Sequence, residues 1–350
     1  MLRAVARIDA DAIARNCAHL KEVAATRLCA VVKADGYGHG ALTAARAAKA
    51  GGADWLAVAT AEEARGLREA GIEGELLVMG AISAEELPAA VAARAHLVAW
   101  RRAFLERVPD GVPVHVKLDT GMGRLGTRDA EEALDVAREA ERRGMLAGAM
   151  THFATSDDDQ AFAREQLAAF MPFVEALPDG IVAHAANSAA ALGIPESRLD
   201  MVRCGIAVYG LDPFQRDPAE QGLEPAMTLA SYVAEVKPIA AGQSAGYGRR
   251  YVAERDGLLA TLPIGYADGV RRALTNQADV LIRGRRFPLA GTVSMDNITV
   301  LVDESVQRGD EAVLIGAQDG ERILAGEWAE RLGTINYEIT CGVSSRVPRA

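Results

Sequence analysis

The hydrophobic pattern of residues 1–224 alternates between two periods. Short apolar runs of strand length occupy residues 28–33, 55–59, 76–79, 96–99, 114–118, 146–152, 181–184 and 199–203. Segments rich in alanine, glutamate and arginine, with helical periodicity, lie at residues 12–23, 61–70, 130–142 and 161–177. This α/β alternation predicts a parallel sheet with helical crossovers. Eight such units favour a closed (β/α)8 barrel of the TIM-like kind over an open doubly wound sheet.

The pattern changes near Pro225. Beyond it come short alternating strands and many glycines, with strands expected at residues 232–236, 257–262, 280–283, 298–302 and 312–315. One helix, residues 324–332, interrupts them. The sequence therefore predicts two domains, a barrel over residues 1–224 and a mostly β C-terminal domain over residues 225–350.

Composition narrows the class of protein. The 350 residues carry a formal net charge of −10, which argues against a nucleic-acid binder. No apolar run approaches the length of a membrane span, and the N-terminus lacks the apolar core of a signal peptide, so a cytoplasmic protein is expected. The four cysteines are scattered without a C-x-x-C pair, which fits a reducing compartment and offers no zinc framework.

Polar residues follow several of the predicted strands. In a closed barrel the carboxyl ends of all strands meet at one face, so these residues are expected to line one pocket. They are Lys33 and Tyr37 after the first strand, Lys117 and Arg124 at the fifth, His152 at the sixth, Asn187 and Ser188 after the seventh, and Arg203, Gly205 and Ile206 at the eighth.

Lys33 stands between two valines and a glycine-rich turn. Partial loss of hydration at the end of a buried strand lowers the pKa of a lysine and makes its amine a usable nucleophile. An ordinary strand-end lysine that reaches back to water explains the local pattern equally well. The surrounding residues must therefore decide between these interpretations.

The loops after the seventh and eighth strands are suited to a phosphate group. Barrels of this type often bind phosphate there through backbone N–H groups and a short helix N-terminus. Ser188 opening a helix and Gly205-Ile206 offering free amides match that arrangement, although a simple helix cap and a simple turn would look the same. A nucleophilic lysine and a phosphate site in one barrel indicate pyridoxal 5'-phosphate, held as a Schiff base.

Two further patterns have simpler explanations. Residues 121–126 match the glycine spacing of a dinucleotide-binding loop, but they follow the fifth strand and lack the acidic residue expected about 20 positions later. The three aspartates at residues 157–159 lie near His152, yet a solvated loop that caps the next helix explains them better than a metal site. We therefore expect no metal.

Residues 31–40, VVKADGYGHG, resemble the cofactor-attachment signature of bacterial alanine racemase. Further segments match the family in order along nearly the whole chain: residues 117–126, 151–154, 187–188, 202–210, 246–248, 265–269, 294–296 and 335–338. The resemblance implies a two-domain, fold-type III pyridoxal phosphate enzyme, an isomerase that acts as a cytoplasmic homodimer. It further implies interconversion of L- and D-alanine, with D-alanine supplied for peptidoglycan.

The resemblance also implies roles for individual residues. Lys33 would form the internal aldimine and act as one of two acid–base groups, and Tyr247, supplied across the dimer interface, would be the other. The cofactor would contact Tyr37, Asn187, Ser188, Gly205, Ile206 and Tyr337, chiefly at its phosphate, with Arg203 at the pyridine nitrogen and His152 against the ring. Arg124 would contact the phenolic oxygen, and Lys117 fits the position of a carbamylated lysine that orients it. Met295, Asp296 and Tyr266 would contact or line the path of the substrate, together with Arg124.

Other functions remain open at this point. A serine racemase or a broad-specificity amino-acid racemase would use the same fold. A non-enzymatic carrier of the cofactor would need no second domain and no Tyr247. A decarboxylase would be expected to place an acidic residue where this chain has Arg203. A dehydrogenase would rest on residues 121–126 alone.

Overall fold

The computed structural model describes residues 2–350 as two compact units. The barrel unit consists of residues 10–224. The β unit consists of residues 225–350 together with the described residues up to Asp9. The predicted barrel domain began at residue 1, whereas residues 2–9 belong with the C-terminal part of the chain. No helix of the described chain has the length and apolarity needed to cross a membrane.

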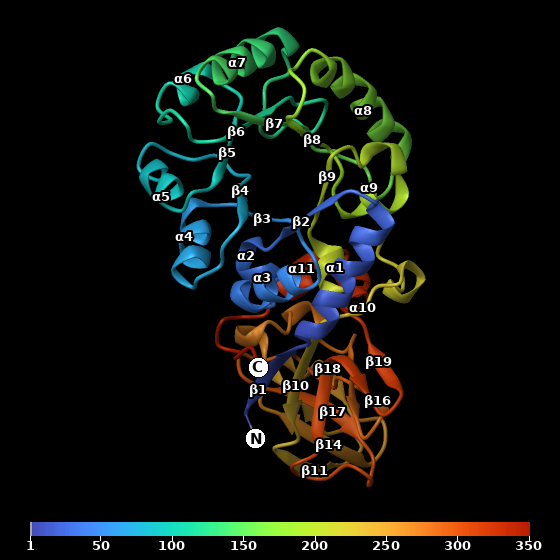
Figure 1. Cartoon of the computed structure of the whole chain (residues 1–350). Helices are drawn as coiled ribbons and strands as arrows, with labels where there is room; N and C mark the ends of the chain where they lie inside the picture. The colour runs from blue at the N-terminus through green and yellow to red at the C-terminus, as the bar shows by residue number, and fades with distance from the viewer. Residues whose placement is uncertain (1) are drawn as a thin grey trace. The chain divides into compact units, whose positions relative to one another are not determined.

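Eight parallel strands form the sheet of the barrel unit, in the order β8-β7-β6-β5-β4-β3-β2-β9. Their bounds are β2 (Arg27–Val31), β3 (Trp55–Val58), β4 (Glu75–Val78), β5 (His96–Ala99), β6 (Val114–Lys117), β7 (Leu146–Met150), β8 (Val182–His184) and β9 (Met201–Cys204). Two backbone hydrogen bonds, Asp200 N to Ala183 O (3.1 Å) and Arg203 N to Ala186 O (2.9 Å), bridge the last gap. The sheet is therefore a nearly closed barrel, and Figure 1 shows its strands as a ring with helices outside.

Helices precede, connect and follow the barrel strands. They are α1 (Ala10–Ala24), α2 (Lys33–Tyr37), α3 (Ala41–Ala50), α4 (Ala61–Glu69), α5 (Leu87–Ala92), α6 (Arg102–Leu105), α7 (Ala130–Arg142), α8 (Gln160–Glu175) and α9 (Ser188–Gly193), with short 3-10 turns at η1 (Pro195–Ser197), η2 (Ile206–Tyr209) and η3 (Pro218–Gln221). Side-chain caps explain several starts: Thr60 forms a capping box with Glu63 before α4, and Asp129 and Asp159 cap α7 and α8.

The sequence prediction and the barrel agree on every strand but differ at their ends. The first predicted strand extended to Lys33, whereas β2 ends at Val31 because Val32 has already left the extended conformation (φ −115°, ψ 20°). The last began at residue 199, whereas β9 begins at Met201 because Leu199 adopts a positive φ of 46°. Hydrophobic periodicity does not register such single-residue departures from the strand conformation.

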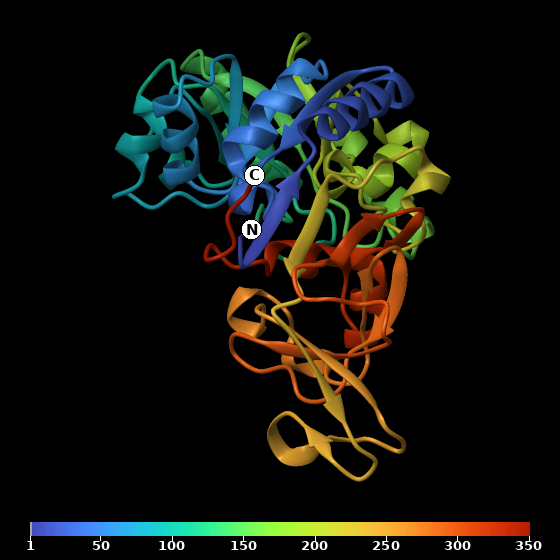
Figure 2. The same ribbon diagram turned by 90° about the horizontal axis from the view of Figure 1, so that it is seen from below.

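The β unit contains two main antiparallel sheets. The larger joins β1 (Ala4–Ile8), β10 (Met227–Tyr232), β18 (Glu311–Gln318), β15 (Asp279–Ile282) and β16 (Arg285–Pro288), with β19 (Glu321–Ile323) on β18. The smaller joins β11 (Glu235–Ile239), β14 (Gly257–Leu262) and β17 (Ile298–Val302), and a two-stranded ribbon pairs β12 (Ser244–Ala245) with β13 (Tyr251–Val252). The C-terminal strands can be followed in the turned view of Figure 2.

Helices and turns complete this unit: α10 (Ala325–Leu332), α11 (Asn336–Cys341), η4 (Tyr247–Arg249), η5 (Tyr266–Asp268) and η6 (Arg272–Leu274). The strand predicted at residues 232–236 is wrong, because the chain leaves β10 after Tyr232 and starts β11 at Glu235. Val233 N instead donates to Asp310 O (2.8 Å) between these strands. Helix α11 and strand β1 were not predicted, since both are short and neither shows a clear period.

Candidate active site

The carboxyl ends of the barrel strands collect the polar residues that the sequence placed there. Lys33 follows β2, Lys117 ends β6, and His152 follows β7. Ser188 opens α9 after β8, and Arg203 lies in β9. Parallel strands bring these ends to one face of a barrel, which is the face that carries active sites in this architecture.

The turn after Lys33 has an unusual backbone. Ala34, Asp35 and Tyr37 have φ values of 53°, 52° and 52°, and Gly36 between them has 62°. Four successive left-handed residues are rare for L-amino acids, because Cβ crowds the following carbonyl oxygen. Side chains support the turn: Glu63 Oε1 accepts from Ala34 N (2.7 Å), and Asp35 Oδ1 accepts from Ala41 N (2.8 Å). The turn carries Lys33 out of the strand direction and returns Tyr37 to the barrel as a buried side chain.

Tyr37, Ser188 and Gly205 form a compact polar cradle. A Cβ at Gly205 would lie 2.3 Å from the Tyr37 hydroxyl, so only glycine fits beside that oxygen. Ser188 Oγ accepts a hydrogen bond from Gly205 N (2.9 Å) and a longer one from Ala207 N (3.4 Å). Hydroxyls and backbone amides of a tight turn are the donors that bind phosphate in proteins.

Arg203 is 3% exposed and donates hydrogen bonds from both terminal nitrogens. Its Nη1 contacts His184 Nδ1 (2.8 Å) and His184 O (3.0 Å). Its Nη2 contacts Thr151 O (2.8 Å), Ala185 O (3.0 Å) and His152 Nδ1 (3.2 Å). Among the described residues, none forms a hydrogen bond with its Nε. The guanidinium is therefore held rigidly, with Nε left as its donor for a ligand.

Positive charge dominates this end of the barrel. Burial, together with the neighbouring cations Arg203, Arg124 and Lys33, lowers the pKa of Lys117 to about 8 against the opposing effect of Asp119. Burial and the same group of cations, Lys117 included, hold the pKa of His152 well below its usual range. Burial also lowers the pKa of Arg203 to about 10. A site with this electrostatic character favours an anionic ligand.

Arg124 and Asn187 belong to the loops that border this cluster. Arg124 is exposed in the loop between β6 and α7, which the Asp119 carboxylate organises by accepting from Gly121 N (3.1 Å) and Gly123 N (3.0 Å). Residues 121–126 are therefore a loop after a central strand, outside the context of a dinucleotide-binding turn. Asn187 caps α9 through Ala190 N (3.0 Å) and accepts from Ser156 Oγ (2.9 Å).

The remaining predicted site residues lie in the β unit. Tyr247, Met295 and Tyr266 are exposed hydrophobic side chains, with 73%, 52% and 42% of their surface accessible. Asp296 forms an ion pair with Arg346 (2.8 Å), and Tyr337 lies half-buried in α11. Thr292 Oγ1 donates to Tyr247 O (2.6 Å) and fixes the turn that presents this tyrosine.

Three histidines in the barrel interior were missed as site residues. His184 contacts Arg203, His115 contacts His184, and His96 contacts His115. One sequence feature could have indicated His115. It precedes Lys117 by two positions on the same strand, so both side chains lie on the same face of that strand. The pairing between strands could not be read from a single sequence.

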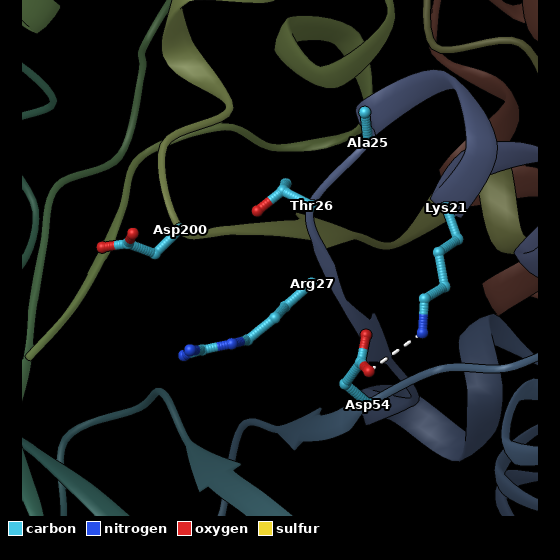
Figure 3. Close-up of a pocket in the computed structure, with 6 residues that line it drawn as sticks. All are labelled: Lys21, Ala25, Thr26, Arg27, Asp54 and Asp200. Carbon is cyan, nitrogen blue, oxygen red and sulfur yellow. Dashed lines mark hydrogen bonds and ion pairs between the residues drawn. The ribbon is translucent and has the colours of Figure 1, made fainter. Parts of the chain in front are cut away.

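A second hollow lies at the opposite end of the strands and is separate from this cluster. Arg27 starts β2, and Asp54 and Asp200 directly precede β3 and β9. Lys21 forms an ion pair with Asp54 (2.9 Å), as Figure 3 shows. The amino ends of barrel strands serve stability more than chemistry.

Two family models match the chain. The model described as "Alanine racemase, N-terminal domain" matches residues 8–213, and "Alanine racemase, C-terminal domain" matches residues 226–350. Among curated relatives, the alanine racemase of Symbiobacterium thermophilum is 44% identical over 98% of this chain and 96% of its own length. Alanine racemase 1 of Bacillus subtilis is 40% identical over 98% of this chain and 92% of its own.

Solved structures show the same likeness. The crystal structure of alanine racemase from a D-cycloserine producing Streptomyces lavendulae superposes with a TM-score of 0.94 at 36% identity, covering 100% of this chain and 97% of that one. The crystal structure of alanine racemase from E. faecalis gives a TM-score of 0.92 at 36% identity, and the match covers 99% of this chain and 97% of that one. The likeness to alanine racemases therefore holds in both sequence and fold, and it covers both units of the chain.

Proposed function

The chain belongs to the alanine racemase family, and from this premise we propose that it interconverts L-alanine and D-alanine with pyridoxal 5'-phosphate as cofactor. The observation that carries the proposal is the group of four cations, Lys33, Lys117, Arg124 and Arg203, at the same barrel end as the cradle of Tyr37, Ser188 and Gly205. A lysine amine for covalent attachment and an anion-binding surface are both needed by this cofactor.

The residues present fit the cofactor. Gly205 packs against the Tyr37 hydroxyl with no room for a side chain, and its N–H donates to Ser188 Oγ, so we assign the hydroxyls of Tyr37 and Ser188 and the amides of this turn to the phosphate. Ile206 opens η2 next to these amides, and we assign Asn187 and Tyr337 to the same group of cofactor contacts. Arg203 Nε is the donor that we assign to the pyridine nitrogen, and His152 is assigned to the ring.

Racemisation requires acid–base groups on both faces of the α-carbon. Pyridoxal phosphate, when bound, would supply the electron withdrawal that makes the α-proton of the substrate acidic. We assign Lys33 Nζ to one face and Tyr247 Oη to the other, so that one takes the proton and the other returns one. Because Tyr247 is exposed in the β unit, it suits delivery to the site of a second copy of the chain, and we propose a homodimer.

Arg203 also bears on reaction specificity. A guanidinium cannot accept a proton and gives one up only with difficulty, so Arg203 would donate a hydrogen bond to a bound pyridine nitrogen and would not protonate it. By keeping that nitrogen neutral, Arg203 would limit the electron withdrawal that the cofactor supplies, which would favour return of the proton to the α-carbon and disfavour transamination relative to racemisation.

Lys117 is suited to carbamylation. Its pKa of about 8 leaves a substantial fraction of neutral amine near neutral pH, and only the neutral amine attacks carbon dioxide. The attack forms an N–C bond and releases one N–H proton, which replaces a buried cation by an anion. Arg124 and Arg203 both act on Lys117, so the carbamate would be stabilised by them and would orient Arg124 toward substrate.

The proposal extends to substrate and cellular role. Met295, Asp296 and Tyr266 are assigned to binding or admitting the substrate together with Arg124. A cytoplasmic enzyme that supplies D-alanine for peptidoglycan is the role that fits the family. Racemisation of serine is the alternative, because it needs the same groups and differs only in side-chain size.

One experiment tests the function and the assignment of the two bases. The purified holoenzyme, incubated with L- or D-alanine in D2O, should exchange the α-proton of both enantiomers and interconvert them. Tyr247→Phe should abolish α-proton exchange from one enantiomer and reduce exchange from the other enantiomer far less. Serine in place of alanine measures substrate preference.

Tyr251→Phe is the matched control, because Tyr251 lies on β13 near Tyr247 and has no assigned role. It should leave both exchange rates unchanged. A protein that binds pyridoxal phosphate but isomerises neither amino acid would refute the function. Equal loss of both exchange reactions in Tyr247→Phe would refute only the two-base assignment.

A further inference from the structure

A continuous chain of hydrogen bonds crosses the interior of the barrel and ends on Arg203. Glu75 Oε2 lies 2.9 Å from His96 Nε2, and His96 Nδ1 lies 3.1 Å from His115 Nε2. His115 Nδ1 lies 2.7 Å from His184 Nε2, and His184 Nδ1 lies 2.8 Å from Arg203 Nη1. We name these residues, Glu75, His96, His115 and His184, the histidine relay.

The relay spans the two ends of the strands. Glu75 and His96 are the first residues of β4 and β5, and Glu75 is half exposed. His115 lies in the middle of β6, and His184 is the last residue of β8. His115 and His184 are fully buried, so water cannot replace any of their hydrogen bonds.

The direction of every bond in the relay follows from its two ends. A guanidinium only donates, so His184 Nδ1 must accept from Arg203. In the neutral ring the proton is then on Nε2, which donates to His115 Nδ1. The same step repeats through His115 to His96, whose Nε2–H finally donates to the Glu75 carboxylate. A carboxylate only accepts, so both ends demand the same direction.

The reverse arrangement is excluded, because it would place a proton on His184 Nδ1, facing the N–H of Arg203 Nη1. A second proton on His96 or His115 would occupy the accepting Nδ1 and face the N–H of the next ring. Burial, with the charge of Arg203 acting on both, keeps the pKa of His115 and His184 well below the ordinary value. Burial also lowers the pKa of His96, against an opposing effect of Glu75.

The barrel makes room for this relay. Gly148 stands directly opposite His115 on β7, and a Cβ there would lie 2.3 Å from His115 Nδ1. Trp55 packs edge-on against both His96 and His115, with ring centroids 4.6 and 5.6 Å apart. These contacts confine the plane of the His115 imidazole, and the hydrogen bond to His184 is formed by its Nδ1.

We propose that the histidine relay is a one-directional hydrogen-bond chain that orients the Arg203 guanidinium, and that His115 is its central positioning residue. His184 fixes Nη1, which leaves Nε to point at the ligand. The same guanidinium sets the tautomer of His152 by donating to its Nδ1. His115 and His96 thus act on the site through Arg203, without contacting substrate or cofactor.

The first test is the protonation of the ring nitrogens. In holoenzyme labelled with 15N on histidine, the signals of His96, His115 and His184 should show protonated Nε2 and unprotonated Nδ1 between about pH 6 and about pH 9. His115→Phe assigns one pair of signals by removing it. An Nδ1–H tautomer or a charged ring at His115 or His184 in this range would overturn the proposal. This measurement does not depend on the enzyme's activity.

The second test separates orientation from packing, and it rests on the proposed racemase function. His115→Phe keeps a buried ring but removes the acceptor of His184, so kcat should fall about 10-fold, the lower end of the loss seen when hydrogen-bond partners of metal-ligating residues are removed. His115→Asn can place its amide oxygen near the former Nδ1 and should recover most of that loss. Gly148→Ala, which displaces the ring without removing it, should resemble His115→Phe.

His19→Gln is the control, because His19 is a histidine of the same unit that bonds to Gln221 O (2.8 Å) outside the relay. It should keep wild-type kcat. Equal losses in the Phe and Asn variants would assign His115 to packing alone and overturn the proposal, as would wild-type kcat in both. Absence of racemisation in the unmodified enzyme would refute the function, and the ring-nitrogen spectrum would still decide the relay.

Discussion

At the scale of single residues, the backbone after Lys33 shows how much a site can demand of its sequence. Three non-glycine residues there, Ala34, Asp35 and Tyr37, adopt the left-handed conformation. Each costs about 1 kcal/mol relative to a right-handed residue. Strain of this kind persists where surrounding contacts hold the chain, and it concentrates at functional sites. Here the hydrogen bonds from Ala34 N to Glu63 and from Ala41 N to Asp35 hold it.

Replacing Ala34 by glycine should therefore stabilise the protein. Ala34 is exposed, and its φ of 53° suits glycine without penalty. After allowing for the greater freedom of glycine in the unfolded chain, we expect the free energy of unfolding to rise by about 0.5 kcal/mol. Urea denaturation measures it. Ala169→Gly, at an exposed position inside α8, should instead lower it by about 1 kcal/mol. A lower free energy of unfolding in both variants would contradict the inference that the backbone is strained at Ala34.

At the scale of elements, strand β1 shows that neighbours in space need not be neighbours in sequence. Its residues pair with β10 from Ala4↔Ser231 to Ile8↔Met227, and so complete the larger sheet of the β unit. Arg3, next to this strand, donates to Asp268 Oδ2 (3.1 Å) and to Pro263 O (3.0 Å). The Asp268 side chain is fully buried, so Arg3 supplies much of its charge compensation.

Removing Arg3 should destabilise the β unit more than removing a comparable surface arginine. Arg3→Ala leaves a buried carboxylate with Gly265 N (2.9 Å) and the more distant Arg346 (3.6 Å), and we expect a loss of about 2 kcal/mol. Arg7→Ala breaks only an exposed pair with Glu311 and should cost less than about 1 kcal/mol. Thermal unfolding of the two variants gives the comparison. Equal midpoints would show that Arg346 compensates fully.

At the scale of the whole molecule, buried neutral histidines make stability depend on pH. Burial and neighbouring cations hold the pKa of His115, His152 and His184 well below 6.5 in the folded state. Below about pH 6.5 the unfolded chain therefore binds protons that the folded chain does not. Their contribution to stability is complete above that pH and is lost as the pH falls through it.

The free energy of unfolding should fall by about 1.4 kcal/mol per pH unit for each of these histidines as the pH drops below about 6.5. Chemical denaturation at intervals between about pH 7.5 and about pH 5 measures this slope. His115→Phe removes one such group and should reduce the slope by one such increment. An unchanged slope in that variant would mean that His115 does not charge on unfolding.

Much of the fold followed from local sequence. The alternation of apolar runs and helical segments predicted all eight barrel strands, because a buried parallel strand must be apolar and its crossover must be helical. The positions of Lys33, Lys117, His152, Ser188 and Arg203 at strand ends followed from the same pattern. The strand predicted at residues 232–236 failed, because two separate strands share one apolar stretch there.

The sequence by itself determined the class of fold and the lysine that follows the first barrel strand, and it predicted the residues that we assign to a phosphate, because each depends on residue type and local period. Only the tertiary structure decided that β1 joins β10, that cations converge on Lys117 and His152, and that His96, His115 and His184 connect in line to Arg203. Those features depend on which strands lie side by side and on the direction of single hydrogen bonds. Such pairings join residues many positions apart, and no local pattern along the chain records them.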